Sequence, residues 1–198
     1  MSTLPVTVLD IDKNSICVNH RELCARLGVD KSFDISQYDV FFKEALDKCQ
    51  PKCAYTCVPI HLLEEHVCDF GFMNVKSLDL YKNLSQCDKA FIFAVTLGIN
   101  AERHLVALSK ISKSRHYICD AFYSAFIEGV CDKAQSIISE GFACKNRFSP
   151  GYGDLSLEIQ HDILHALDAS KLLGITLTGS LLMTPQKSIT AIMGIKAK

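Results

Sequence analysis

The sequence contains no tryptophan, only 5 prolines and no excess of charge of either sign among its 198 residues. Lys and Arg number 21 against 22 Asp and Glu, which gives a formal net charge of −1. Non-specific nucleic-acid binding depends on a basic excess, so we expect no nucleic-acid partner. No apolar run approaches the roughly 20 residues of a membrane-spanning helix, so we expect no membrane partner. The first cation is Lys13, which argues against a secretory signal peptide.

Hydrophobic residues make up 48% of the chain and charged residues 22%, which is typical of a globular protein. A chain of this length is expected to form one domain over residues 1–198. Cysteine is abundant, but a secreted disulfide scaffold is usually shorter and richer in turns. We therefore expect free thiols and a cytoplasmic protein. The 10 cysteines are Cys17, Cys24, Cys49, Cys53, Cys57, Cys68, Cys87, Cys119, Cys131 and Cys144.

The spacing of apolar residues predicts an α+β fold with a mixed or antiparallel sheet and long helices, because single strands alternate irregularly with helices. The run at 91–97 is apolar on both faces and is expected to be a central strand. The last two strands are expected to form a hairpin with Pro185 in the turn. Strands are predicted at 6–11, 54–60, 67–75, 91–97, 175–182 and 188–193, and helices at 19–27, 36–49, 77–84, 101–111, 115–140 and 156–173.

Three cysteines, Cys49, Cys53 and Cys57, follow the spacing C-x3-C-x3-C. Three thiolates close together can hold an iron–sulfur cluster. The second gap is one residue longer than in the C-x3-C-x2-C motif of radical enzymes, and the strand-like pattern after Pro51 disfavours a compact cluster loop. We expect buried thiols, with an iron–sulfur protein as a rival interpretation.

The pair His161 and His165 is spaced as in the zinc-protease helix motif. Such a site needs a third ligand, and no His, Asp, Glu or Cys follows Asp168. The helical phase places both histidines opposite the apolar stripe that contains Ile163. We therefore expect a polar surface here and no metal site.

The long helix at 115–140 has two faces of different character. Its apolar stripe is expected to contain Phe122, Phe126, Val130 and Ile137. The opposite stripe is polar and is expected to face solvent unless another part of the chain points toward it. This polar stripe consists of Ser124, Glu128, Asp132 and Gln135.

The loop at 147–154, with the sequence RFSPGYGD, is the most informative stretch. Arg147 can bind a carboxylate through a bidentate pair, and Pro150 fixes the backbone in an extended conformation. Gly151 allows close approach to a ligand, and Tyr152 can stack on a ring or face a cation. These properties suit a cationic, aromatic ligand that carries an amino acid, although an ordinary Pro-Gly turn would show the same residues.

Four stretches in this order resemble the activation domain of cobalamin-dependent methionine synthase, most closely the short stand-alone proteins of that family. The resemblance covers residues 90–195 well and residues 1–90 only loosely. The Arg-x-x-Pro-Gly-Tyr loop is its most specific part. The stretches are FAVTLG at 93–98, DAF at 120–122 with Glu128, RFSPGY at 147–152, and LTGSLLMTP at 177–185 with Ser188.

The resemblance implies binding of S-adenosylmethionine and reductive reactivation of cob(II)alamin, with one electron supplied by a flavodoxin-like donor. It implies that Arg147 holds the ligand's carboxylate, that Ser149 and Gly151 offer backbone groups, and that Tyr152 offers its ring. Either Glu128 or Ser124 would face the ligand from the long helix. We expect no catalytic side chain, because methyl transfer to a reduced cobalt needs no general base.

The sequence also departs from the resembled family. It lacks the Asp-x-His-x-x-Gly cobalamin-ligand motif, so cobalamin is expected only through a partner, a corrinoid protein or a split methionine synthase. The chain would then be a component of a methyltransferase system rather than an autonomous enzyme. The turn at 179–185 is expected to face the corrinoid. The alternative is a non-catalytic module that senses S-adenosylmethionine or binds a corrinoid protein.

Overall fold

A computed structural model describes residues 4–197 and has an α+β fold built on a four-stranded antiparallel sheet. The strand order is β1-β2-β6-β9, and every neighbouring pair is antiparallel. A three-stranded sheet (β3-β4-β5) and a two-stranded one (β7-β8) complete the strands. The bounds are β1 Thr7–Asp10, β2 Lys52–Pro59, β3 His61–Leu63, β4 Val67–Asp69, β5 Asn74–Lys76, β6 Cys87–Thr96, β7 Thr176–Leu177, β8 Met183–Thr184 and β9 Ser188–Lys196.

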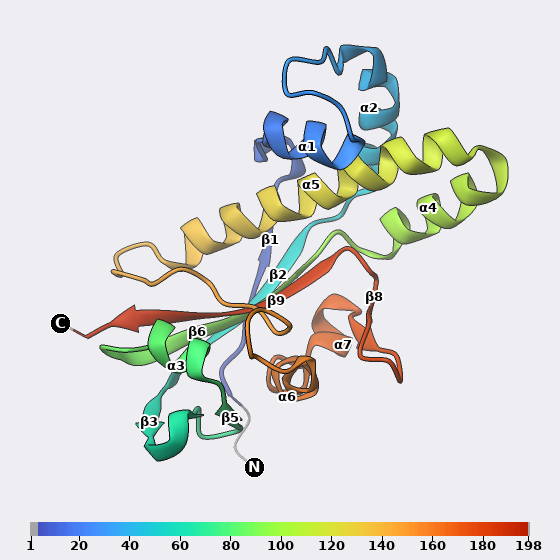
Figure 1. Cartoon of the computed structure of the whole chain (residues 1–198). Helices are drawn as coiled ribbons and strands as arrows, with labels where there is room; N and C mark the ends of the chain where they lie inside the picture. The colour runs from blue at the N-terminus through green and yellow to red at the C-terminus, as the bar shows by residue number, and fades with distance from the viewer. Residues whose placement is uncertain (1–3, 198) are drawn as a thin grey trace.

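The helices cover both faces of this sheet, as Figure 1 shows. On one face α5 crosses the sheet with α1, α2 and α4 packed around it, and on the other face lie α3, α6 and α7. The α-helices are α1 His20–Leu27, α2 Asp39–Lys48, α3 Leu78–Asn83, α4 Ile99–Ile111, α5 Lys113–Ile138, α6 Gln160–Ala166 and α7 Ala169–Leu173. Short 3-10 turns are η1 Lys13–Ser15, η2 Ser36–Tyr38, η3 Glu64–His66 and η4 Leu157–Ile159.

Strand β6 separates two hydrophobic clusters. Because side chains alternate along a strand, Phe91 and Phe93 enter the cluster beneath α5, whereas Ile92 and Ala94 enter the cluster beneath α6 and α7. The strand is buried from Ala90 to Thr96. The expected central strand is therefore confirmed, and so is the expected α+β class with antiparallel pairing and long helices. Within residues 4–197, no helix combines the length and the apolar character needed to cross a membrane.

Local turn chemistry fixes several helix ends close to where the sequence predicts them, at 19–27 and 77–84. Asn19 caps α1 by accepting a hydrogen bond from the amide of Glu22, and Gly28 ends the helix in the left-handed conformation. Ser77 caps α3 in the same way through the amide of Leu80. These caps satisfy amide and carbonyl groups that a helix end would otherwise leave unpaired.

Two predicted elements are wrong because the chain turns inside them. The predicted strand at 67–75 is two strands, β4 and β5, joined at Gly71, which has φ of 79° and whose amide donates to Asp69 Oδ1 at 2.7 Å. The predicted helix at 156–173 is η4, α6 and α7, with a left-handed Asp168 between the last two. The bend at Asp168 lets Leu167, Ala169 and Leu173 all reach the core.

The predicted hairpin of 175–182 with 188–193 is also wrong. Within 175–182, only Thr176–Leu177 forms a strand, β7, and it pairs with β8. The predicted strand at 188–193 is part of β9, which pairs with β6. The polar residues after Leu177 turn the chain at once, and the amide of Leu181 donates to the carbonyl of Thr178 at 3.0 Å.

The predicted apolar stripe of the long helix is wrong at Ile137, because Ile137 is 40% exposed and Ile138 is buried in its place. Ile138 continues the four-residue spacing of Val130 and Ala134.

Candidate functional site

The loop at 147–154 is held at both ends. At its start, Phe148 and Ile192 of β9 exchange two backbone hydrogen bonds of 2.8 and 2.9 Å. At its end, the Asp154 carboxylate accepts from the hydroxyl of Ser77 and from the amides of Leu78, at 2.7 Å, and Asp79, at 3.2 Å. These hydrogen bonds, that from Ser77 above all, hold the pKa of Asp154 below its usual value. The loop is therefore a fixed wall between β9 and α3.

Within the loop, Gly151 adopts φ of 87°, where a side chain would be strained. A Cβ atom there would also lie 3.0 Å from Leu157 Cδ2. The Gly151 amide donates to the carbonyl of Leu155 at 2.8 Å, and the Tyr152 amide donates to that of Ser149 at 3.1 Å. The Tyr152 ring lies edge-on to Phe148 and is 72% exposed. The conformation therefore needs glycine, and it places the tyrosine ring at the surface.

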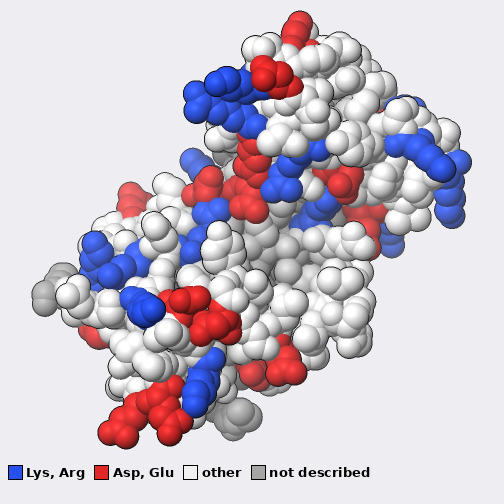
Figure 2. Space-filling view, viewed as in Figure 1, with Lys and Arg blue, Asp and Glu red and all other residues white. Residues whose placement is uncertain are grey.

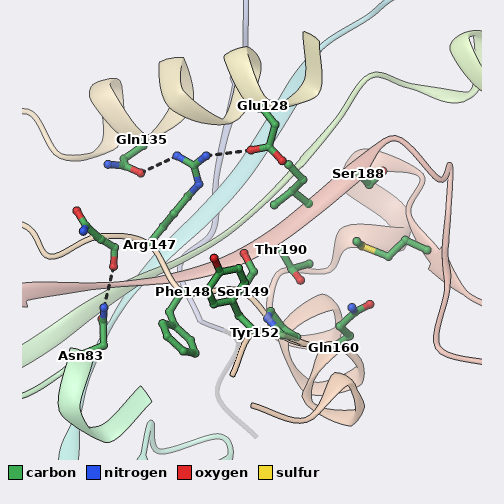
Figure 3. Close-up of a pocket in the computed structure, with 14 residues that line it drawn as sticks. Asn83, Glu128, Gln135, Arg147, Phe148, Ser149, Tyr152, Gln160, Ser188 and Thr190 are labelled. Atoms are coloured by element: carbon green, nitrogen blue, oxygen red, sulfur yellow. Dashed lines mark hydrogen bonds and ion pairs between the residues drawn. The ribbon is translucent and has the colours of Figure 1, made fainter. Parts of the chain in front are cut away.

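The Arg147 side chain points from the loop to the polar stripe of α5 (Figure 3). Its Nη1 lies 2.5 Å from Asp132 Oδ1 and 3.1 Å from Gln135 Oε1, and its Nη2 lies 3.0 Å from Glu128 Oε2. Burial alone would lower the pKa of Arg147, but the carboxylates of Asp132 and Glu128 raise it overall. The polar stripe of α5 therefore does not face solvent alone, because the guanidinium of Arg147, from another part of the chain, points toward it.

A cavity of about 770 Å³ opens beside Arg147, between α5, the loop, β9 and α6 (Figure 3). Its volume lies within the range of small-molecule sites, roughly 300–1,000 Å³. Polar and apolar side chains both contribute to its wall. The lining residues are Asn83, Glu128, Gln135, Asn146, Arg147, Phe148, Ser149, Pro150, Tyr152, Gln160, Met183, Ser188, Ile189 and Thr190.

Charge is distributed unevenly around this hollow. In Figure 2, acidic and basic side chains lie together along the α5 side, whereas the side formed by α6 and α7 is mostly uncharged. The α5 side contains the ion pair between Arg147 and Glu128, whose side chains are 25% and 35% exposed. A ligand with both charged and neutral parts would find a matching surface for each.

Most of the sequence-predicted site residues meet here. Arg147, Ser149, Pro150, Tyr152 and Glu128 all line the cavity. Two others, Ser124 and Gly151, do not belong to the lining. The Gly151 amide is already bonded within the loop, so that residue can offer a ligand only its carbonyl.

The environment of Ser124 explains why it lies outside the lining. Lys187 Nζ donates to Ser124 Oγ at 2.7 Å and lies 2.7 Å from Asp120 Oδ1. The Lys187 side chain is only 14% exposed. Ser124 therefore belongs to a contact that joins α5 to the turn before β9, whereas Glu128, one turn further along α5, faces the cavity.

Sequence reasoning missed several lining residues, above all Gln160 and Asn83. Gln160 is 6% exposed, and its Oε1 has no hydrogen-bond partner. Asn83 Oδ1 is unpaired as well. A single polar residue within a predicted helix gives no signal of this kind, because its burial depends on how α6 packs. Met183 and Ser188 lie within the motif at 177–188, which did signal them as a group.

The two alternative metal sites have no support in the geometry. Cys53 and Cys57 both lie on the extended strand β2, and four residues of strand span roughly 13 Å. Burial raises the pKa of Cys49 to about 12, so it is a thiol at neutral pH. His161 and His165 are exposed on α6. In the described part of the chain, no three His, Cys, Asp or Glu side chains gather as metal ligands.

The chain has an α+β fold with a cavity lined by charged and apolar side chains, and solved structures were compared with this fold. The chain is similar to the crystal structure of the MetH reactivation domain bound to AdoHcy, with a TM-score of 0.70 and 14% sequence identity. The match covers 97% of this chain and 78% of that one. No protein-family model and no curated protein sequence matches the chain. The similarity shows that the two proteins share a fold.

Proposed function

We propose that the chain binds S-adenosylmethionine in this cavity and supports the reductive methylation of cob(II)alamin on a separate corrinoid protein. The observation that carries the proposal is that Arg147, Ser149, Pro150 and Tyr152 line one cavity together with Glu128. Similarity of fold to a domain solved with AdoHcy supports the same class of ligand. The partner would be a corrinoid protein such as a split cobalamin-dependent methionine synthase.

The charged end of the cavity suits the amino-acid part of the ligand. The guanidinium of Arg147 has five N–H groups, and side chains of α5 accept hydrogen bonds from three of them. The others can donate to the ligand's carboxylate, while Glu128 can accept from its ammonium group. A zwitterion placed beside this ion pair, with its carboxylate toward Arg147 and its ammonium group toward Glu128, has both of its charges compensated.

The loop would orient the sulfonium. Ser149 and Pro150 line the wall beside Arg147, and the exposed ring of Tyr152 can face the positive sulfur. The chemistry itself would belong to the ligand and to the partner's cobalamin. One electron from a flavodoxin-like donor would reduce the cobalt of cob(II)alamin, which could then accept the methyl group from S-adenosylmethionine. S-adenosylhomocysteine would be the second product. The chain's contribution is to hold the methyl group where the corrinoid can approach it.

The turn at 179–185 is the proposed corrinoid-facing edge. It contains Leu182, which is 58% exposed, next to Met183, which lines the cavity. An apolar side chain beside the opening of a ligand site can contact a partner without closing the site. Docking surfaces of transient complexes are usually modest in area.

Methyl transfer in vitro tests the proposal. The purified chain, a strong reductant, S-adenosylmethionine and a cob(II)alamin-loaded corrinoid protein from the same genome should yield the methylcobalamin spectrum. Omission of the chain should abolish that yield. If the chain binds S-adenosylmethionine but no corrinoid protein is methylated, the sensing or binding module replaces the reactivation role.

A further inference from the structure

Gln160, the first residue of α6, lies in the cavity wall with a buried polar group that nothing in the fold satisfies. Its side chain is among the few polar ones that are buried, at 6% exposure, and its Oε1 has no hydrogen-bond partner. Of the three unpaired buried side-chain polar atoms in residues 4–197, two, on Gln160 and Asn83, belong to cavity-lining residues. Buried acceptors are normally hydrogen-bonded, so these two indicate what the cavity is built to bind.

The position of Gln160 separates its role from that of Arg147. Figure 3 shows Gln160 on the α6 side of the cavity, away from the Arg147 side chain and its partners on α5. The lining of the cavity also includes the apolar side chains of Met183 and Ile189, from β8 and β9. The Gln160 end therefore offers a neutral amide, whereas the Arg147 end offers an ion pair.

A carboxamide presents one acceptor and one donor side by side. Its best complement is a flat ligand edge with a donor next to an acceptor. The N6 amino group and N7 of adenine form such an edge, and glutamine pairs with it through two hydrogen bonds. A carbonyl at position 6, as in hypoxanthine, would meet the Oε1 acceptor with another acceptor.

We propose that Gln160 is the specificity-determining residue for the adenine base of the bound nucleoside, an inference that rests on the proposed binding of S-adenosylmethionine. The ligand would then span the cavity with its amino-acid part at Arg147 and its base at Gln160. The buried acceptor that the fold leaves unpaired would be satisfied by the N6 amino group.

Titration calorimetry with two ligands tests this assignment. The wild-type chain should bind S-adenosylhomocysteine about 30-fold more tightly than S-inosylhomocysteine, because the deaminated base loses one hydrogen bond and faces an unpaired acceptor. Gln160→Met, which keeps the side-chain length, should bind the adenosyl ligand roughly 10-fold less tightly and should no longer discriminate between the two. Gln135→Met, at the charged end of the same cavity, is the matched control and should leave the ratio unchanged.

Unfolding of the ligand-free variants adds a second measurement. Gln160→Met removes an unpaired buried amide, so its unfolding temperature should not fall below that of the wild type. Should this variant nevertheless fail to fold, Gln160→Leu provides the second variant, and its discrimination between the two ligands should also be weaker than that of the wild type because leucine has no acceptor for the N6 amino group. An unchanged ratio in a folded Gln160 variant would overturn the base assignment and leave the proposed function standing. If the wild type binds neither ligand, both proposals are overturned.

Discussion

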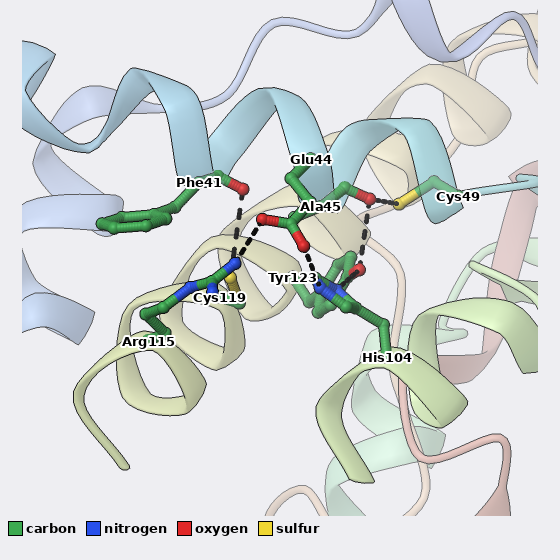
Figure 4. Close-up of polar contacts among 8 residues, drawn as sticks. All are labelled: Phe41, Glu44, Ala45, Cys49, His104, Arg115, Cys119 and Tyr123. Atoms are coloured by element: carbon green, nitrogen blue, oxygen red, sulfur yellow. Dashed lines mark hydrogen bonds and ion pairs between the residues drawn. The ribbon is translucent and has the colours of Figure 1, made fainter. Parts of the chain in front are cut away.

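Two arginines, Arg115 and Arg147, each form an ion pair with a glutamate at α5, and the space around the two pairs differs. Near the start of α5, Arg115 Nη2 lies 2.6 Å from Glu44 Oε2, and Glu44 Oε1 lies 3.2 Å from His104 Nε2 (Figure 4). His104 Nδ1 lies 2.8 Å from the hydroxyl of Tyr123, which donates to the Ala45 carbonyl at 3.1 Å. This network joins α2, α4 and α5.

Exposure does not distinguish the two arginines. The side chains of Arg115 and Glu44 are 35% and 37% exposed, against 25% and 35% for Arg147 and Glu128. The difference lies in what adjoins them, because Arg147 and Glu128 line a cavity of about 770 Å³, whereas the Arg115 network lies between packed helices. The comparison teaches that an ion pair is accessible to a ligand only where a cavity lies beside it.

The largest expected effect is the loss of ligand affinity in Arg147→Ala. Removing a charge-assisted pair should cost about 2–3 kcal/mol, or roughly 30–150-fold in the affinity for S-adenosylmethionine. Arg115→Ala is the matched control, and its affinity should equal that of the wild type. Titration calorimetry measures both. Equal affinities for Arg147→Ala and the wild type would remove Arg147 from the site.

A variant of the Arg115 network is expected to lose stability and to keep its ligand affinity. His104→Ala should remove the hydrogen bonds that join Glu44 to Tyr123 and lower the free energy of unfolding by about 2 kcal/mol. Ligand affinity should stay unchanged in this variant. Urea unfolding of His104→Ala and the wild type measures the difference. A variant as stable as the wild type would show that the network of Figure 4 contributes little.

A smaller effect is expected for Tyr152→Ala at the rim of the cavity. Loss of a partly exposed cation–π contact should weaken binding by about 1 kcal/mol, or roughly 5-fold, and slow methyl transfer. Tyr117→Ala changes another exposed tyrosine, on the far part of α5, and serves as the control. If both variants bind the ligand equally well, the Tyr152 ring makes no contact with it.

The smallest expected effect is on the pH dependence of stability. Burial alone would raise the pKa of Glu44, but hydrogen bonds from His104 and Arg115 hold it below its usual value of 4.5. A lowered pKa in the folded state contributes stability that is present above pH 4.5 and is lost as the pH falls through the folded-state value. Glu44→Gln should therefore lose less stability than the wild type between about pH 5 and 3.

Urea unfolding at several pH values measures this dependence. Glu140→Gln, an exposed position beyond the end of α5, is the control and should follow the wild-type curve. A Glu44→Gln curve parallel to that of the wild type would mean that the carboxylate contributes nothing to acid sensitivity.

The elements that could be predicted from sequence are those with strong local signals. Strand β6 is apolar on both faces, and α5 has a long helical periodicity, so both were predictable, as were the starts of α1 near Asn19 and of α3 at the cap Ser77. The break at Asp168 was not, because the apolar spacing continues through it and only packing against the sheet favours the bend. Pairing partners are non-local, which is why β9 was matched with the wrong strand.

The candidate site was predictable in its charged half. Arg147 and Glu128 stand in recognisable patterns, a Pro-Gly loop and a polar helix stripe, and the structure brings them within 3.0 Å. Gln160 and Asn83 could not be found, since their significance comes from burial without a partner. Burial of that kind depends on how α3 and α6 pack beside the loop, which no local pattern encodes.

A crystal structure of the chain with S-adenosylhomocysteine tests the central claim most directly. The account predicts the ligand in the cavity between α5, the loop at 147–154 and β9, with its carboxylate within hydrogen-bond distance of Arg147. A ligand bound elsewhere on the chain, or a carboxylate that does not contact Arg147, would contradict it.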